Sequence, residues 1–370
     1  MHIAMNPPFH ADHVGSLRRP PALIEAHTAH LQGKLSREAL KELEDKAIDG
    51  AIAMQERVGL QAITDGELRR NHWRDRFFER VDGFSREKIA SSFIFTDFSG
   101  KQYTGMPIPV VIGKLQWREN LTADDFDYLQ QRTKRTVKAT LPSPSANHFF
   151  SGDKSLAQSP YKDRKAFFAD VCAIYRREIA DLGRRGCTYL QIDEVPIAVL
   201  CDPANQGRVR ERGEDPSELI DDYIAAIDDA VRDRPAGMTI CVHLCRGNQG
   251  HGQASGGYDP VAERLLQNTA VDGFFLEYDT DRAGSFAPLR YLPHGKSAIL
   301  GLISTKLHEL EPLDFIKRRL DEASRYVDLG RLGLSPQCGF ASGYTTDRFS
   351  MEEQERKLAH LVKIAGEIWK

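Results

Sequence analysis

A histidine and a cysteine two positions apart, His243 and Cys245, are the strongest candidates for chemistry in this 370-residue chain. They end the apolar run MTICVHLC (238–245), which predicts a buried strand. Because alternate residues of a strand project to one face, the imidazole and the thiol are expected to converge. An isolated His-x-Cys pair is weak evidence, since both residue types occur in protein cores. Glu277 and Cys338, at the ends of two further strands, could complete a tetrahedral site that suits zinc.

This set of side chains also indicates a type of reaction. Two thiolates and a carboxylate around a divalent zinc would leave a net charge of about −1, which makes the metal a poor activator of water. Such a site is better suited to holding a third sulfur, which would replace the weakest ligand, the oxygen of Glu277. A free thiol has a pKa of about 8.5, and metal coordination deprotonates it. The set therefore predicts a zinc enzyme that alkylates or dealkylates a thiol.

Helical patterns alternate with short apolar runs along most of the chain, which is typical of an α/β fold. The segment 36–59 has apolar residues at three- and four-residue spacing and predicts a helix, and similar patterns occupy 163–182, 216–232, 258–268, 312–326 and 350–369. The expected strands are 10–16, 62–67, 136–142, 189–194, 239–245, 274–279, 298–303 and 331–337. Eight strands separated by helices predict a single (β/α)8 TIM barrel domain over 1–370.

Two further features bear on this barrel. The stretch 91–117 falls outside the alternation and is expected to form a β-hairpin inserted after the second strand. Six of the eight expected strands end in polar or ligand-type residues. Active sites of such barrels lie at the carboxyl ends of the strands, so these residues are expected to share one site.

Composition excludes several other classes of protein. The hydrophobic fraction of 41% and charged fraction of 28% are those of a soluble globular protein. A net charge of −3, without a long basic run, argues against nucleic acid or an anionic membrane as partner. No apolar stretch predicts a transmembrane helix or a signal peptide, so a cytoplasmic location is expected. The six cysteines are then expected to be thiols or metal ligands. The oligomeric state stays open.

Several motifs, taken in order, resemble the C-terminal catalytic barrel of cobalamin-independent methionine synthase, and especially the short single-barrel members of that family. The resemblance covers about residues 10 to 345 and is carried by HADHVGSLRRP (10–20), TDGELRR (64–70), LQIDE (190–194), VHLCRGN (242–248), FFLEYD (274–279) and LSPQCGFAS (334–342). It implies zinc on His243, Cys245, Glu277 and Cys338.

The resemblance also implies a site for an amino-acid thiol, homocysteine. Val14, Gly15 and Ser16 match an Ile-Gly-Ser turn that holds the homocysteine carboxylate. Glu67 and Asp193 match acidic residues that pair with the substrate ammonium, and both are candidate catalytic residues.

The chain also departs from the family pattern. The second, N-terminal barrel that helps to bind polyglutamylated methylfolate has no counterpart here. The proton-donating histidine of the family falls on Ser304, and a second glutamate falls on Val199. The pterin-stacking tryptophan has no clear match in 141–150. These departures leave the methyl donor open: a methylfolate, a methylated corrinoid protein or a small methyl compound.

Other interpretations remain beside this one. The alternative enzyme is a zinc-dependent alkyl-thiol transferase or lyase that joins or cleaves a different thiol and electrophile, as relatives acting on epoxides and coenzyme M do. A zinc-stabilised scaffold without catalysis is the third. Cys241 is expected to be a core residue rather than a ligand. The arginines 18, 19, 69 and 70 are expected to form a solvated or salt-bridged face rather than an anion site.

Overall fold

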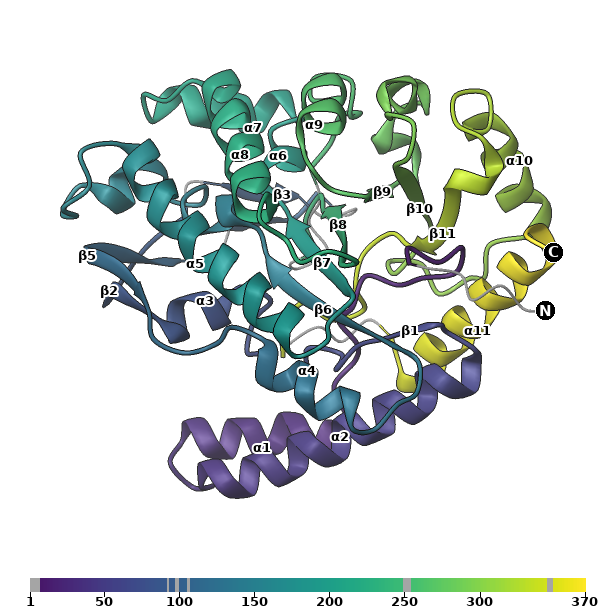
Figure 1. Ribbon diagram of the computed structural model, residues 1–370, viewed down its shortest axis with the longest axis horizontal. Helices are drawn as coiled ribbons and strands as arrows, with labels where there is room; N and C mark the ends of the chain where they lie inside the picture. The colour runs from purple at the N-terminus through teal and green to yellow at the C-terminus, as the bar shows by residue number, and fades with distance from the viewer. Residues whose placement is uncertain (1–6, 92, 97–99, 105–106, 249–253, 345–348) are drawn as a thin grey trace.

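The computed structural model describes residues 7–370 except 92, 97–99, 105–106, 249–253 and 345–348 (Figure 1). Its centre is one parallel sheet whose strands neighbour each other in the order β1, β6, β7, β8, β9, β10, β11. The strands are β1 (Ala62–Ile63), β6 (Thr136–Pro142), β7 (Tyr189–Glu194), β8 (Thr239–Leu244), β9 (Gly273–Glu277), β10 (Ser297–Ile303) and β11 (Leu332–Pro336). The predicted α/β fold with a parallel sheet is confirmed, and the sheet forms a half-barrel.

The predicted first strand, 10–16, is not a regular strand. A single parallel bridge joins Ala11 to Leu334, and the amide of Leu334 donates to the carbonyl of His10 at 2.8 Å. Asp12 explains the short pairing, because its carboxylate accepts the amide of His13 at 2.7 Å and so competes with a sheet ladder. The seam between this segment and β11 thus replaces an eighth strand, and the predicted count of eight is not reached among the described residues.

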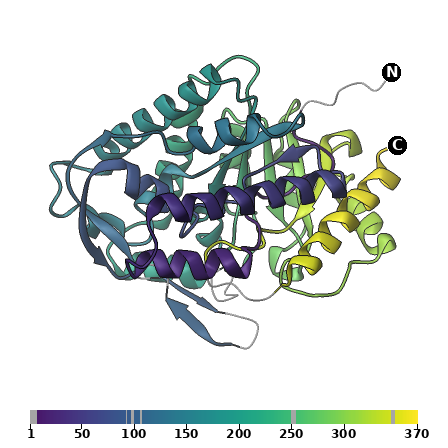
Figure 2. The ribbon, with the colours of Figure 1, turned by 90° about the horizontal axis from the view of Figure 1, so that it is seen from below.

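Helices lie outside the sheet and cover it (Figure 1). Each of the six predicted helical segments contains a helix. The helices are α1 (Pro21–Leu31), α2 (Arg37–Val58), α3 (Asp75–Arg80), α4 (Ala123–Gln130), α5 (Arg164–Arg184), α6 (Pro196–Val199), α7 (Pro203–Glu211), α8 (Pro216–Val231), α9 (Ala262–Asn268), α10 (Leu313–Ala323) and α11 (Met351–Ile368). The helices α1 and α2 lie side by side, and α11 packs against α2 (Figure 2). None of the helices in the described part of the chain combines the length and apolar character needed to cross a bilayer.

Local sequence signals set the ends of the longest helix. The side chain of Ser36 caps α2 by accepting the amide of Ala39, which satisfies one of the free donors at a helix start. Gly59 ends the helix in a left-handed conformation with φ 97°, which a residue without Cβ adopts easily.

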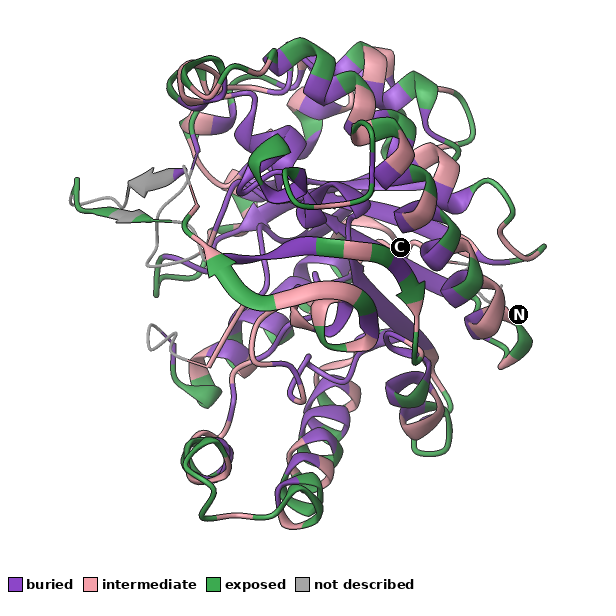
Figure 3. Ribbon diagram, turned by 90° about the vertical axis from the view of Figure 1, so that its left-hand side faces the viewer, coloured by how far each residue is buried: buried purple, intermediate pink, exposed green. Residues whose placement is uncertain are grey.

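Between β1 and β6 the chain leaves the sheet and forms antiparallel strands: β2 (Val81–Ile89), β3 (Ile94–Thr96), β4 (Gln102–Thr104) and β5 (Ile108–Trp117). β2 pairs with β5, and β3 pairs with β4. The excursion begins at Val81 rather than at the predicted position 91. β2 was missed because its residues are mostly exposed or half-buried, so it lacks an apolar pattern. Figure 3 shows the β2–β5 pair in front of the buried sheet, with many of its residues exposed.

The core on the concave side of the sheet combines apolar and charged residues. Phe9, Ala62, Tyr189, Cys241, Phe275 and Ile299 form one buried cluster there. Beside it the fully buried ammonium of Lys138 donates to the carboxylate of Asp12 at 3.0 Å, which compensates both buried charges. Cys241 is thus a core residue, as predicted.

Candidate active site

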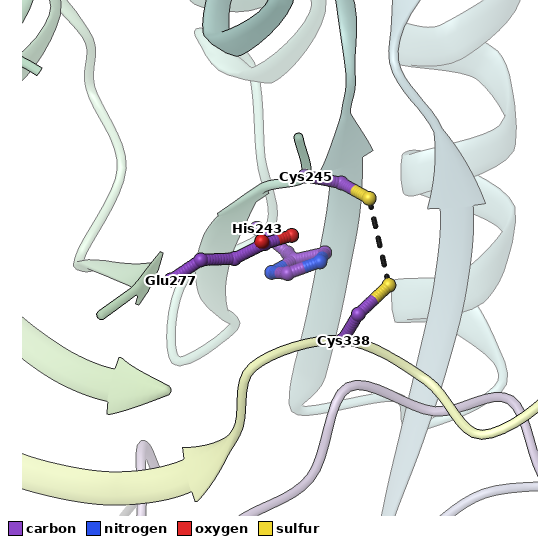
Figure 4. A group of neighbouring side chains, drawn as sticks. All are labelled: His243, Cys245, Glu277 and Cys338. Carbon is purple, nitrogen blue, oxygen red and sulfur yellow. Dashed lines mark hydrogen bonds between the residues drawn. The ribbon is translucent and has the colours of Figure 1, made fainter. Parts of the chain in front are cut away.

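The four predicted metal ligands lie together at the carboxyl end of the sheet. His243 is in β8 and Cys245 directly follows it, Glu277 is the last residue of β9, and Cys338 follows β11. Their ligand atoms all lie within 4.8 Å of one another. The two sulfur atoms face each other at 3.5 Å, and the imidazole and carboxylate converge on them from two neighbouring strands (Figure 4).

The state of His243 indicates that this group fits a metal. Its side chain is buried, and neither ring nitrogen has a hydrogen-bond partner among the described residues. Buried polar atoms without partners are rare in folded proteins. Soft sulfur, imidazole and a carboxylate are the donors of tetrahedral zinc sites, so the residues present fit zinc.

The contact between the two sulfur atoms shifts the pKa values of the two cysteines in opposite directions. The hydrogen bond with Cys245 holds the pKa of the Cys338 thiol well below its usual range, against the effect of burial, and His243 contributes in the same direction. The same hydrogen bond and burial raise the pKa of Cys245. The two sulfur atoms thus share a hydrogen bond in which either can donate. A bound metal would hold both as thiolates.

Both carboxylate oxygens of Glu277 have partners. One accepts the backbone amide of Arg246 at 2.9 Å, and the other accepts the guanidinium of Arg282 at 2.8 Å. Burial raises the pKa of Glu277, and Arg282 opposes this shift. The backbone amide of Arg246 is a partner of the kind that orients a metal ligand.

A pocket is lined by three of the four predicted metal ligands, His243, Cys245 and Cys338. Four of the five predicted substrate residues also line it: Val14, Ser16, Glu67 and Asp193. Gly15 lies between the first two, and its backbone has φ 131°. A Cβ there would lie 2.8 Å from Cγ2 of Thr140. Across the seam, a Cβ on Gly339 would lie 1.8 Å from Oγ of Ser16, so only glycine allows this approach.

The two carboxylates of the pocket are buried and electrostatically linked. Burial raises the pKa of Asp193 to about 7, with a further contribution from Glu67. Burial also raises the pKa of Glu67. Arg70 opposes this shift, because its Nη1 lies 3.4 Å from Oε1 of Glu67. Glu67 has φ 59°, a left-handed conformation that costs a non-glycine residue on the order of 1–3 kcal/mol. A strained acidic residue that faces a pocket is typical of a binding site.

Five further residues that line the pocket were not predicted as site residues: His72, Trp73, Arg74, Phe150 and Asn248. The guanidinium of Arg74 stacks on the ring of Phe150, with 4.4 Å to the centroid. The first three come one residue after the TDGELRR motif, and Asn248 ends the VHLCRGN motif, so these two motifs are the signals that could have found them.

Arg19, Arg69 and Arg70 form ion pairs or hydrogen bonds to backbone carbonyls, in agreement with the predicted salt-bridged alternative, and their side chains are buried rather than solvated. Arg69 pairs with Asp125 at 2.7 Å. Arg19 donates to the carbonyls of Glu67 and Arg70 and so fixes the loop that carries Glu67. Arg19 thus supports the site by holding this loop.

A second group of ligand-type side chains, His148, Asp153 and Glu214, lies away from the pocket. His148 is hydrogen-bonded through both ring nitrogens, to the hydroxyl of Tyr223 at 2.9 Å and to Asp153 at 3.1 Å.

The carboxylates of this group also have partners. Asp153 pairs with Arg164 at 2.8 Å, and Glu214 accepts from Arg212 and from the amide of Asp153. All three residues therefore already have protein partners.

A family model described as "Cobalamin-independent synthase, Catalytic domain" matches residues 9–367. The chain belongs to this family. The resemblance found in the sequence is confirmed, and membership supports a methyltransferase role.

Individual relatives agree with this assignment. The chain is 38% identical to the uncharacterized protein YxjH of Bacillus subtilis, over 98% of this chain and 95% of the relative. A crystal structure of a candidate vitamin-B12-independent methionine synthase from Listeria monocytogenes shares 32% identity and a TM-score of 0.78 over 99% of both chains. A B12-independent methionine synthase from Shewanella, in complex with selenomethionine, has a TM-score of 0.72 at 20% identity over 97% of both chains, which shows the common fold.

Proposed function

We propose that the chain is a zinc-dependent S-methyltransferase that transfers a methyl group to homocysteine or a similar amino-acid thiol. The proposal is carried by the two thiols, imidazole and carboxylate whose ligand atoms lie within 4.8 Å of one another at the pocket. Family membership supports it, and so does the binding of selenomethionine by the Shewanella relative.

His243, Cys245, Glu277 and Cys338 would hold the zinc. When bound, the metal would supply thiol activation, because coordination lowers the pKa of the substrate thiol and yields a nucleophilic thiolate at neutral pH. A substrate thiol in the pocket lined by His243, Cys245 and Cys338 would lie beside this metal.

Glu67 and Asp193 would hold the substrate ammonium. Burial raises the pKa of both, and a cation placed between them lowers it again, so substrate binding and ionisation of the carboxylates support each other. The backbone at Val14 and Gly15 and the hydroxyl of Ser16 would hold the substrate carboxylate. Specificity for an α-amino acid follows from this pairing of opposite charges.

The donor is a methylfolate or another methyl compound. Trp73, Phe150 and Arg74 also line the pocket and would contact this donor. Ser304, at the position of the family histidine, donates its hydroxyl to Asp279 at 3.3 Å. Because a hydroxyl is a weak acid, this difference favours a second candidate: the same zinc-thiolate chemistry with a different electrophile.

The test is calorimetric titration of homocysteine into the zinc-loaded protein, in buffers of different ionisation heat. We expect release of about one proton per thiol bound. Homoserine is the matched ligand control, since it carries the same amino-acid groups without sulfur and is expected to release none. The variant Cys245→Ser is the protein control and is expected to lose the proton release. Failure of the fully metallated protein to bind homocysteine would contradict the proposal.

A further inference from the structure

We propose that Arg282 is a positioning residue that receives the carboxylate of Glu277 when the substrate thiolate takes its place among the metal ligands. This inference rests on the proposed function. It assigns a role in thiol binding to a residue that the sequence patterns did not single out.

The first support is the position of Arg282. It lies in a short 3-10 turn, Asp281–Ala283, that follows β9, and its side chain is only 12% exposed. One terminal nitrogen, Nη2, contacts Oε2 of Glu277 at 2.8 Å and Oδ1 of Asp279 at 2.9 Å. Its Nε donates to the hydroxyl of Thr280 at 3.0 Å. The guanidinium is thus held in a fixed plane beside the one ligand that is expected to leave.

The second support is a donor that is not used. The other terminal nitrogen of Arg282, Nη1, is buried and has no hydrogen-bond partner among the described residues. Arginine and carboxylate prefer two parallel hydrogen bonds, which are stronger and more directional than one. In the present arrangement Glu277 uses one terminal nitrogen. A carboxylate released from the metal could use both.

The third support is the balance of charge. With two thiolates, a carboxylate and divalent zinc, the site carries about −1. A substrate thiol that joins it gives its proton to solvent, its sulfur forms a bond to zinc, and the bond from zinc to the Glu277 oxygen breaks with the electron pair staying on oxygen. The protein then holds one additional buried negative charge. An unpaired buried charge is costly, and the guanidinium of Arg282 compensates it.

The backbone limits how far the carboxylate moves. Oε1 of Glu277 accepts the amide of Arg246 at 2.9 Å, and the amide of Glu277 donates to the hydroxyl of Tyr258 at 2.9 Å. These contacts hold the residue in place, so a carboxylate released from the metal would stay close to Arg282 and could return when the product leaves.

The experiment compares Arg282→Met and Arg282→Lys with the wild type. Zinc affinity is measured by competition with a chelator, homocysteine affinity by calorimetry on the zinc-loaded protein, and the number of zinc–sulfur ligands by X-ray absorption with and without homocysteine. The matched control is Arg234→Met. Arg234 forms a similar pair with Asp272, at 2.7 Å, at the opposite end of β9.

The proposal predicts opposite behaviour of the two affinities. In Arg282→Met, homocysteine affinity falls by about tenfold or more, because the displaced carboxylate loses its counter-ion. Zinc affinity stays equal or rises, since Glu277 is freed for the metal. The homocysteine affinity of Arg282→Lys, which keeps the positive charge, lies between those of the wild type and Arg282→Met. Arg234→Met binds zinc and homocysteine as the wild type does.

Two results would overturn the inference. Removal of an ordinary supporting partner of a metal ligand weakens metal binding by about 10- to 100-fold. A loss of zinc affinity in Arg282→Met that equals the loss of homocysteine affinity would assign Arg282 to that role. Unchanged homocysteine affinity in both variants would also refute it. If the wild type loads zinc but does not bind homocysteine, the proposed function fails instead.

Discussion

Two groups of ligand-type side chains in this molecule have similar composition but opposite environments. In the first group, His243 is buried with both ring nitrogens unpaired among the described residues, and two sulfurs face each other at 3.5 Å. In the second group, His148 is hydrogen-bonded through both nitrogens, and both carboxylates pair with arginines.

The difference concerns what each group requires. The first group has donor atoms without protein partners, so a metal would satisfy them. The second is already complete, because each acidic residue has a cation and the histidine has two partners. Proximity of histidine and acidic residues therefore does not by itself define a metal site. A zinc site is indicated by nitrogen and sulfur ligand atoms that lack protein partners.

The largest expected effect separates the two groups by metal binding. Cys245→Ser and Cys338→Ser are expected to weaken zinc binding by about 100-fold or more, since a zinc site divides about 10–16 kcal/mol among four ligands. His148→Ala is expected to keep one zinc per chain with unchanged affinity. Metal analysis after dialysis and chelator competition measure both. Loss of zinc in His148→Ala would show that the second group also binds metal.

A smaller effect concerns stability. The buried pair Glu214–Arg212 also holds the carbonyl of Phe149, next to the pocket residue Phe150. Glu214→Gln leaves the guanidinium without its carboxylate, and we expect the free energy of unfolding to fall by about 3 kcal/mol. Denaturant unfolding of the zinc-loaded protein checks this, with zinc content as the control. An unchanged unfolding midpoint would show that the pair contributes nothing.

The smallest effect is the pH dependence of the second group. Burial lowers the pKa of His148, and Asp153 only partly opposes this. Below the unfolded pKa of about 6.5 the unfolded chain binds a proton that the folded protein resists, so the stability contributed by neutral His148 is lost as pH falls below that value. Unfolding between pH 5 and 8 is expected to show a shallower acid decline for His148→Gln than for the wild type. If the stability of both proteins fell equally with pH, a lowered pKa of His148 would be contradicted.

The sequence was sufficient to predict that the four side chains of the first group lie together, because strand geometry determines their position. The two-residue period of β8 places His243 and Cys245 on one face, and parallel strands bring Glu277 and Cys338 to the same edge. Arg282 could not be predicted in this way, since it lies in a 3-10 turn whose path depends on tertiary contacts.

The same limit explains the remaining differences from prediction. Trp73 and Phe150 reach the pocket from loops, where no periodicity predicts side-chain direction. The first strand was predicted from its residue types, but Asp12 bonds its own backbone and reduces the pairing to one bridge at Ala11. The strands β2 to β5 lie outside the sheet. The start of β2 at Val81 was not predicted, because its exposed residues lack an apolar pattern.

The seam between the segment at Ala11 and β11 also has a consequence for the order of folding. His10 and Leu332, which it joins, are 322 positions apart in the sequence. Closing so long a loop costs conformational entropy before its contacts form, so the seam is expected to form late. Cys338 lies just beyond β11, and Ser16 lies opposite it. An intermediate that contains only β7 to β9 would present three of the four ligands, and the complete ligand set and the substrate pocket would arise together in the last step.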